Sequence, residues 1–346
     1  MDNMNVRYLH DDLQVMTAPA DRIDIAALGA TSLRIGMGCA SLGSRISERA
    51  GKVALAAAFE AGITWFDVAP PYGIGRGETI LGSFARGRRD RMLICTKVGL
   101  APPQRRAALA RVYDLARPAA TAAKGLRRRF RQISATRNLT LPLTPELVLA
   151  SLDRSLGALG TDYVDVLALH DAIPADTRRA DILGALHDAR AAGKLRAISV
   201  AGSLAACETA LKVPSPFQLV QFAAPPGDAA ALALFDAIRG SAITPLSHSV
   251  LGLGAAADRF AERLAANPDL RALVEGFGFN GRPNEIAVPL LLRRALAVNR
   301  RGLVLLSMFS RGHLEAALAA LHAPPLPARL LDAIDSLPVR EEEVSE

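Results

Sequence analysis

Residues 62–73 read Gly-Ile-Thr-Trp-Phe-Asp-Val-Ala-Pro-Pro-Tyr-Gly. The short apolar run Thr64–Asp67 within this segment ends on a carboxylate, and Tyr72 follows it closely. A short apolar run that ends near a polar residue or glycine is typical of a buried strand. The segment therefore predicts a strand with two reactive side chains, Asp67 and Tyr72, at or just beyond its carboxyl end.

The same pattern recurs along the chain, and eight short apolar runs can be counted. They are Arg34–Gly38, Thr64–Asp67, Met92–Lys97, Tyr163–His170, Leu195–Val200, Phe217–Phe222, Ala242–Leu246 and Leu303–Ser307. Stretches at helical spacing alternate with them, among them Ser47–Ala61, Thr144–Leu159, Ala180–Ala192, Ala229–Arg239 and Gly312–Leu321. Eight alternating units in a chain of 346 residues predict an α/β fold, a (β/α)8 TIM barrel rather than a doubly wound sheet, although the count alone does not decide between them.

The remaining segments give the expected domain organisation. Two short apolar runs within Ile23–Leu33 predict a β-hairpin before the first barrel strand, and the long connection at 248–302 is expected to hold two further helices. We expect a single barrel domain over residues 21–338, with a flexible N-terminus at 1–20 and an acidic tail at 339–346. The chain is therefore expected to form one domain.

Composition narrows the class of protein. Half of the residues are hydrophobic and 22% are charged, which excludes a disordered chain and suffices for a large core. The charged start of the chain does not read as a secretory signal, and no stretch reaches the ~20 apolar residues of a membrane span. Three widely spaced cysteines, Cys39, Cys95 and Cys207, favour a reducing cytoplasm and no metal site.

The net charge of +7 fits a nucleic-acid binder as well as an enzyme, but it is unevenly distributed. Residues 101–142 hold ten basic residues and one acid, so they carry +9 and the rest of the chain sums to −2. We interpret this segment as a basic insertion after the third strand, either a solvated loop or a short amphipathic helix. In a barrel it would emerge on the catalytic face.

One hypothesis is that the basic insertion covers the pocket and favours an anionic substrate or the cofactor phosphates. Contact with nucleic acid or an anionic membrane is the rival hypothesis. Because nucleic-acid binding would rest on charge alone, we expect no nucleic-acid partner.

Four residues with reactive side chains fall at or just after predicted strand ends: Asp67, Tyr72, Lys97 and His170. In a barrel such ends meet at the catalytic face. Taken singly, Asp67 could cap a turn, Tyr72 could be a loop aromatic, and His170 could be a hydrogen-bonded strand residue. Lys97, however, is one of only five lysines and ends an apolar strand, where an unpaired ammonium would be costly. Together the four residues favour a catalytic site.

The segments around these residues resemble a known family. The signature of the aldo-keto reductase family resembles residues 62–73 together with Gly75, Gly77, Glu78, Leu81 and Gly82. Residues 96–99 resemble the lysine segment of that family, and residues 159–171 resemble its histidine strand. Weaker similarity extends from about residue 28 to 322. The pattern looks more like the bacterial and plant sugar-dehydrogenase branch than the mammalian steroid reductases.

The resemblance implies an NAD(P)-dependent oxidoreductase that interconverts a carbonyl and an alcohol, with Asp67, Tyr72, Lys97 and His170 as a catalytic tetrad. Tyr72 would be the general acid and base, although a free tyrosine, with a pKa of about 10, is a poor proton shuttle near neutrality. Lys97, held charged by Asp67, would lower that pKa. His170 would donate a hydrogen bond to the carbonyl oxygen. A nicotinamide cofactor would carry the hydride, because no side chain supplies one.

The resemblance also implies a set of cofactor contacts at the barrel mouth. They are Gly38, Cys39, Gln221, His248, Ser310 and Arg311. The first two would line the nicotinamide, Gln221 would contact its carboxamide, and His248 would stack on the ring or serve only as a turn residue. Ser310 and Arg311 precede a predicted helix and make a candidate site for the adenosine phosphate. The expected cofactor is NADP, with NAD as the alternative.

The sequence departs from the family in the cofactor site. The family's Gly-Val-Ser-Asn after the fifth strand reads Ser199-Val200-Ala201-Gly202 here, and the basic residue usual inside the last helix is His313. These differences leave the choice of cofactor open and support an alternative, a catalytically weak nucleotide-binding barrel that acts as a sensor or partner protein. The sequence identifies neither the carbonyl or alcohol substrate, nor the direction of the reaction, nor the oligomeric state.

Overall fold

A computed structural model describes residues 21–102, 139–212, 215–252 and 255–336. The expected flexible N-terminus at 1–20 and the acidic tail at 339–346 lie outside these residues, as does most of the basic insertion at 101–142.

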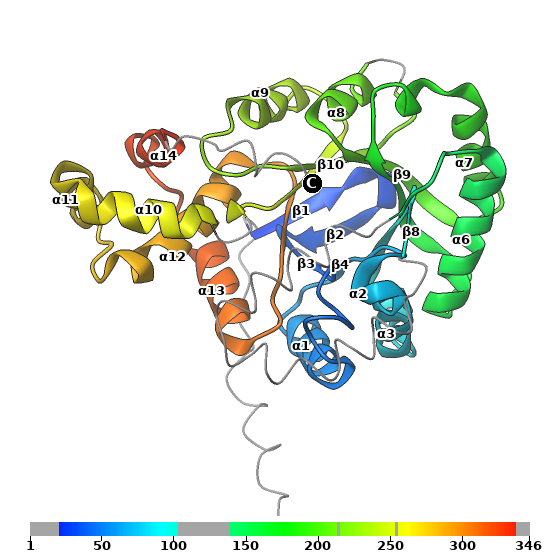
Figure 1. Ribbon diagram of the computed structural model, residues 1–346, viewed down its shortest axis with the longest axis horizontal. Coiled ribbons are helices and arrows are strands. Elements are labelled where there is room, and N and C mark those ends of the chain that lie inside the picture. Colours follow the sequence, from blue (N-terminus) through cyan, green and yellow to red (C-terminus); the bar gives the residue numbers. More distant parts are fainter. Residues whose placement is uncertain (1–20, 103–138, 213–214, 253–254, 337–346) are drawn as a thin grey trace, which may run out of the picture.

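Eight parallel strands form a closed barrel (Figure 1). They are β3 (Ile35–Gly38), β4 (Trp65–Asp67), β5 (Leu93–Val98), β8 (Val164–Ala172), β9 (Leu195–Gly202), β10 (Leu219–Ala223), β11 (Thr244–His248) and β12 (Leu303–Leu306). Pairing between β12 and β3 closes the ring. Each strand overlaps one of the eight apolar runs, so the predicted (β/α)8 barrel is confirmed.

Helices surround the barrel (Figure 1). They are α1 (Glu48–Glu60), α2 (Tyr72–Gly75), α3 (Gly77–Ala85), α6 (Pro145–Leu159), α7 (Ala180–Ala191), α8 (Leu204–Ala210), α9 (Ala229–Ile238) and α13 (Arg311–His322), with single 3₁₀ turns at Ala26–Leu28, Arg89–Arg91 and Asp176–Arg178. Five of these helices begin with a capping side chain whose oxygen accepts a hydrogen bond from a backbone N–H of the first turn. The capping residues are Ser47, Thr144, Ser203, Asp228 and Ser310. These caps satisfy donors that a helix start otherwise leaves unpaired.

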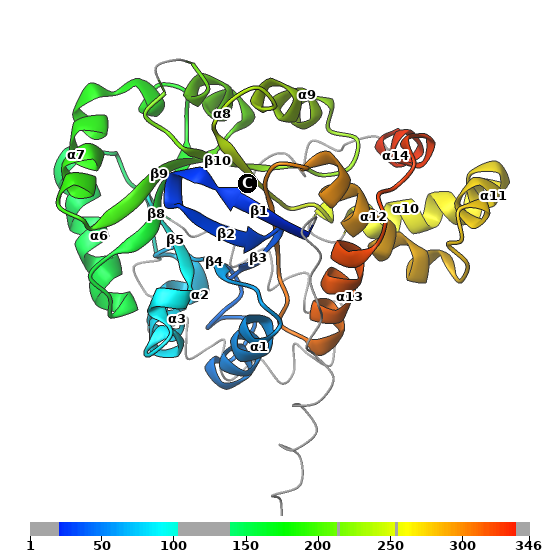
Figure 2. The same ribbon diagram turned by 180° about the vertical axis from the view of Figure 1, so that it is seen from behind.

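An antiparallel hairpin closes one end of the barrel (Figure 2). Its strands are β1 (Arg22–Ile25) and β2 (Ala30–Leu33), as the sequence predicted, and β2 leads directly into β3. Ile25 and Leu28 of the hairpin pack in one cluster with the inward-facing residues of the barrel, including Trp65 and Leu303. The amino ends of the strands are therefore sealed by apolar side chains, and the carboxyl ends are left for chemistry.

The connection at 248–302 holds three helices in its described part, α10 (Ala255–Ala266), α11 (Pro268–Gly276) and α12 (Pro283–Val298), so the prediction of two was wrong. The break between α10 and α11 falls at Asn267. Its side chain caps α11 by accepting a hydrogen bond from the Leu270 N–H, and Pro268 takes the first helical position. These helices and α14 (Ala328–Asp335) build a second apolar cluster beside the barrel (Figure 1).

A buried ion pair ties this second cluster to the barrel. The fully buried Arg294 of α12 donates its Nε–H to Asp335 of α14 at 2.9 Å and a second N–H to the Ala224 carbonyl, just beyond β10, at 3.0 Å. Asp335 also accepts the backbone N–H of Gly227. Three segments distant in sequence are thus joined near the carboxyl end of β10.

All three cysteines are buried free thiols. No helix among the described residues is both long enough and apolar enough to cross a bilayer.

Candidate active site

Strand alternation directs the predicted catalytic residues into the barrel. Side chains two apart along a strand point to the same face. In β4, β5 and β8 the residues packed in the barrel interior are Trp65, Cys95 and Ala168. Asp67, Lys97 and His170 each follow one of them by two positions. The three side chains therefore lie above the apolar interior, at the carboxyl ends of three adjacent strands.

Lys97 is the centre of this group. Its ammonium forms an ion pair with Asp67 and donates to the Val68 carbonyl and to the Tyr72 hydroxyl, each at 3.2 Å. The Lys97 side chain is 1% exposed and that of Asp67 is 4% exposed. Burial alone lowers the pKa of Lys97, but Asp67 and the other groups around it outweigh burial and raise it. Lys97 is therefore a charged ammonium at neutral pH.

Tyr72 reaches the site from the loop after β4, where it begins the one-turn helix α2. The next residue, Gly73, has a φ of +64°, and a Cβ there would lie 1.9 Å from the Leu42 carbonyl oxygen. Only glycine fits this turn without moving the backbone. The close approach of the Leu42 segment fixes the direction in which Tyr72 enters the barrel mouth.

The net pKa shift of Tyr72 differs from the expectation. Burial raises its pKa to about 12, because the phenolate is poorly solvated there. Lys97 does lower that pKa, as predicted, but Asp67 raises it. The net shift is upward, so Tyr72 carries its proton at neutral pH and is ready to donate it.

His170 completes the cluster. Its ring meets that of Tyr72 edge to face, with centroids 5.8 Å apart and planes at 83°. Burial lowers its pKa well below the usual value, and the neighbouring Lys97 and His248 lower it further. The imidazole is therefore neutral, with one N–H donor. Its Nδ1 is buried and has no hydrogen-bond partner among the described residues.

Glu78 supports the lysine strand from outside the barrel, a role that the sequence motif did not suggest. This buried carboxyl of α3 accepts a hydrogen bond from the Thr96 hydroxyl at 2.6 Å, next to Lys97. Burial raises its pKa, while hydrogen bonds from Thr96 and Ser155 lower it. An acid within an apolar helix was the available signal, because a buried carboxyl needs partners.

The predicted carboxamide contact, Gln221, lies level with the tetrad. It is paired in register with Ala201 of β9, and Ala201 is in turn paired with His170. Gln221 is 4% exposed, and its Oε1 has no hydrogen-bond partner among the described residues. A buried acceptor without a donor is costly, so this oxygen suits a ligand that brings an N–H.

The asparagine expected at position 202, the last residue of β9, is missing, and its absence has a steric counterpart. A Cβ at Gly202 would lie 2.4 Å from the carbonyl oxygen of Ala172. Ala172 approaches so closely because β8 has a register shift between His170 and Ala172. The end of β8 therefore occupies the space that a side chain at position 202 would need.

Gly38 and Cys39 lie at the end of β3, beside the tetrad. Gly38 is paired in register with Asp67, and the Cys39 N–H donates to the Asp67 carbonyl at 2.8 Å. Cys39 is fully buried, and burial raises the pKa of its thiol, with Asp67 adding to the effect. Cys39 therefore lies beside the site as a neutral thiol.

His248 ends β11, two positions after Leu246 of the barrel interior. Its Nδ1 lies 3.0 Å from the Ser249 hydroxyl. Burial lowers its pKa to about 4, with Lys97 acting in the same direction and Asp67 against it. The ring is therefore neutral at pH 7 and lies close enough to Asp67 and Lys97 for their charges to act on it. It stays a candidate for stacking on nicotinamide.

Ser310 and Arg311 begin α13, as expected, but both side chains have protein partners. Ser310 accepts the His313 N–H at 3.2 Å as the helix cap, and Arg311 pairs with Glu315 one turn later. The Arg311 side chain is 76% exposed, so it can turn toward a ligand at small cost. Of the expected anion site, the helix start is in place, while His313 is exposed on its first turn.

The described ends of the basic insertion meet at the carboxyl end of β5. Leu100–Ala101 (β6) pairs antiparallel with Leu139–Thr140 (β7), and the Leu141 N–H donates to the Gly99 carbonyl. The insertion therefore leaves and re-enters the barrel beside the strand that carries Lys97, as predicted. The residues between lie outside the described part of the chain.

Comparisons with known proteins agree with this geometry. The model of the aldo/keto reductase family matches residues 34–338. The chain is 33% identical over 185 residues to D-threo-aldose 1-dehydrogenase from a Pseudomonas species, a match that covers 51% of each protein. It is 33% identical over 153 residues to pyridoxal 4-dehydrogenase from Microbacterium luteolum, covering 42% of each. The chain thus spans about half the length, or less, of these curated relatives.

Solved structures show the same fold. Glycerol dehydrogenase from Gluconobacter oxydans has a TM-score of 0.68 at 16% identity, over 94% of this chain and 99% of that one. At this level of identity the likeness concerns the barrel alone.

Proposed function

The chain belongs to the aldo/keto reductase family, and we propose that it interconverts a carbonyl and an alcohol with a nicotinamide cofactor, using Tyr72 as general acid and base. One observation carries this proposal. A buried, charged Lys97 bridges Asp67 and the hydroxyl of Tyr72 at the barrel mouth, with His170 against the tyrosine ring. A purely structural role explains each residue singly, but it gives no reason to bring all four together at the barrel mouth.

In the reducing direction Tyr72 donates its proton to the oxygen of the substrate. Its high pKa keeps the proton available at neutral pH, and the ammonium of Lys97, 3.2 Å away, stabilises the phenolate that remains. Asp67 holds that ammonium charged and in place. In the oxidising direction the same phenolate takes the proton of the alcohol.

His170 orients the carbonyl. The imidazole is neutral, so its one ring N–H can donate a hydrogen bond to the carbonyl oxygen while the ring keeps its proton. Because its ring contacts that of Tyr72, a single oxygen atom can lie within reach of both donors. Two donors on one oxygen polarise the carbon that accepts the hydride.

The residues at the mouth fit a nicotinamide cofactor, which supplies or accepts the hydride when bound. The unpartnered Oε1 of Gln221 suits the carboxamide N–H₂. Gly38 and Cys39 would line the ring, and His248 would stack on it. Backbone N–H groups at the start of α13, with Ser310 and Arg311, would hold the adenosine phosphate.

We propose NADP as the cofactor, with NAD as the alternative. Arg311, at the helix start, supports a cofactor with an additional phosphate. Ala201 and Gly202 weaken the carboxamide end of the site in either case.

The substrate is proposed to be a small carbonyl or alcohol compound. The similar proteins named above act on aldoses, pyridoxal and glycerol by their names. The +9 charge of residues 101–142, whose described ends flank the mouth, supports an anionic member of that class. A cytoplasmic location is proposed from the three free thiols.

Fluorescence titration with NADPH and NADH, followed by turnover of a panel of neutral and anionic aldehydes and ketones, tests this function. We expect saturable binding, tighter for NADPH, and cofactor oxidation with some members of the panel. Tight nucleotide binding without turnover of any carbonyl would favour the sensor alternative instead.

A further inference from the structure

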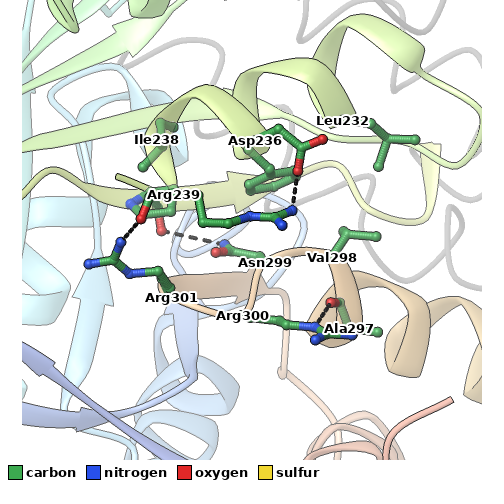
Figure 3. Close-up of a pocket in the computed structure, with 11 residues that line it drawn as sticks. Leu232, Asp236, Ile238, Arg239, Ala297, Val298, Asn299, Arg300 and Arg301 are labelled. Carbon is green, nitrogen blue, oxygen red and sulfur yellow. Dashed lines mark hydrogen bonds and ion pairs between the residues drawn. The ribbon is translucent and has the colours of Figure 1, made fainter. Parts of the chain in front are cut away.

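A pocket of about 520 Å³ lies at the opposite end of the barrel from the tetrad (Figure 3). Its lining comes from the end of α9, from Pro245, and from residues 297–301 before β12. Pro245 is the second residue of β11, whereas His248 at the catalytic mouth is its last. The pocket therefore opens at the amino end of the strands, away from the proposed cofactor.

The walls of this pocket are largely apolar. Its apolar lining includes Leu232, Phe235 and Ile238 of α9 and Val298 at the end of α12. The ring of Phe235 is held by Phe222 of β10, with centroids 4.9 Å apart. The volume of the pocket falls within the range of ~300–1,000 Å³ that is usual for small-molecule sites. It can therefore accommodate an apolar group the size of one aromatic ring.

Three arginines line the same pocket, and two of them have no carboxylate partner among the described residues. Arg239 pairs with Asp236. Arg300 donates its Nε–H to the Ala297 carbonyl at 3.1 Å, and Arg301 donates to the Arg239 carbonyl (Figure 3). These bonds offset the partial negative charge at the ends of α9 and α12. A guanidinium has five N–H donors, so donors remain for a ligand.

The lining is electropositive as a whole. Three arginines and one aspartate give it a formal charge of +2. Arg300 acts on a basic residue outside this lining: burial lowers the pKa of Arg34, Asp21 opposes this, and Arg300 lowers that pKa further. An anion near Arg300 would relieve this repulsion.

We propose that this pocket is a second ligand site, which binds a phosphate monoester with an apolar body. The phosphate dianion would match the charge of +2. It would accept N–H groups from Arg300 and Arg301 once these exposed side chains, which point apart in Figure 3, turn toward it. The apolar body would pack between Phe235 and Val298. This inference is independent of the proposed function, because no residue of the tetrad or the cofactor site takes part.

Calorimetric titration of the full chain with phenyl phosphate, at saturating NADPH so that the cofactor site is filled, tests the proposal. The pocket variant is Arg300→Gln/Arg301→Gln. The matched control is Arg86→Gln/Arg190→Gln, which removes the same charge from two exposed arginines, one just after α3 and one on α7. We expect the pocket variant to raise the Kd for phenyl phosphate by about tenfold or more, since charge-assisted hydrogen bonds are lost. The control variant should bind as wild type does, and thermal unfolding should show that both variants remain folded at the temperature of the titration.

Two further probes separate the parts of the site. Inorganic phosphate should bind more weakly than phenyl phosphate, because it lacks the apolar body, and phenol should not bind detectably. Absence of phenyl phosphate binding to the wild type would overturn the proposal, as would an equal loss in the two double variants. Equal affinity for inorganic and phenyl phosphate would overturn the apolar part.

Discussion

The ammonium nitrogen of Lys97 lies 3.2 Å from the phenolic oxygen of Tyr72. The two side chains come from different segments, the end of β5 and the loop after β4, and they meet where strand alternation turns Lys97 into the barrel. Burial favours the neutral tyrosine, and the ammonium favours the phenolate. Burial therefore keeps the proton on Tyr72 before the reaction, and the ammonium of Lys97 lowers the free energy needed to remove it.

Replacing Lys97 by Met should lower both stability and activity. Asp67 would be left buried without its cation, which costs about 3–5 kcal/mol, so urea denaturation should show a clear loss. Adding Asp67→Asn should recover stability but not turnover. The exposed pair Lys52–Glu48 provides the control, since Lys52→Met should cost less than about 1 kcal/mol. Full activity in Lys97→Met would contradict the proton-stabilising role.

Gly99→Ala should lower kcat through His170. Gly99 has a φ of +125°, and a Cβ there would lie 2.8 Å from the His170 carbonyl oxygen, so the end of β8 must shift. Gly87→Ala is the matched control, because Gly87 also has a positive φ but no atom near its Cβ position. Gly87→Ala should lose about 1 kcal/mol of stability because of its positive φ, and Gly99→Ala should lose more, because β8 must also shift. If kcat falls equally in both, the contact with β8 is not what positions His170.

Ala201 and Gly202 replace a serine and an asparagine of the family's cofactor site, and we expect different results from restoring each of them. Ala201→Ser should lower the Kd for the nicotinamide cofactor by about twofold to tenfold, the value of one neutral hydrogen bond. Gly202→Asn should instead reduce stability, because its Cβ would meet the Ala172 carbonyl at 2.4 Å. Fluorescence titration and thermal unfolding measure the two effects. Tighter binding by Gly202→Asn at wild-type Tm would show that β8 yields easily.

Acid should destabilise the chain through the partly buried His248. Burial lowers the pKa of His248 to about 4, whereas an unfolded histidine titrates near 6.5. The unfolded state therefore binds more protons in this window, and stability falls as the pH drops from about 6.5 to about 4. His248→Gln should reduce that slope in urea denaturation, whereas His187→Gln, an exposed residue of α7, should not. An unchanged slope in His248→Gln would exclude this contribution.

Much of the fold was predictable because period and spacing are local properties. Apolar runs such as Met92–Lys97 were long enough to mark strands, and a barrel brings their ends together whatever the loops do. The break at Asn267 was missed because helical composition continues on both sides of it. A cap followed by proline was the only signal.

The electrostatics of the site depended on packing that spacing does not reveal. Sequence reasoning identified Lys97 as a neighbour of Tyr72 and predicted a lowered pKa, but the degree of burial reverses the net direction. The crowding at Gly202 is likewise set by the register shift in β8. The arginine-lined pocket unites residues 61 positions apart, Arg239 and Arg300, which no linear motif connects.

The most direct test of the proton-donor role is the rate of hydride transfer in Tyr72→Phe under single-turnover conditions, with cofactor and a carbonyl substrate of the wild type. Removing the hydroxyl should slow this step by about 10²- to 10⁴-fold, while the Kd for the cofactor stays unchanged, because the ring still packs against His170. Hydride transfer at the wild-type rate in Tyr72→Phe would contradict the role of Tyr72 as general acid.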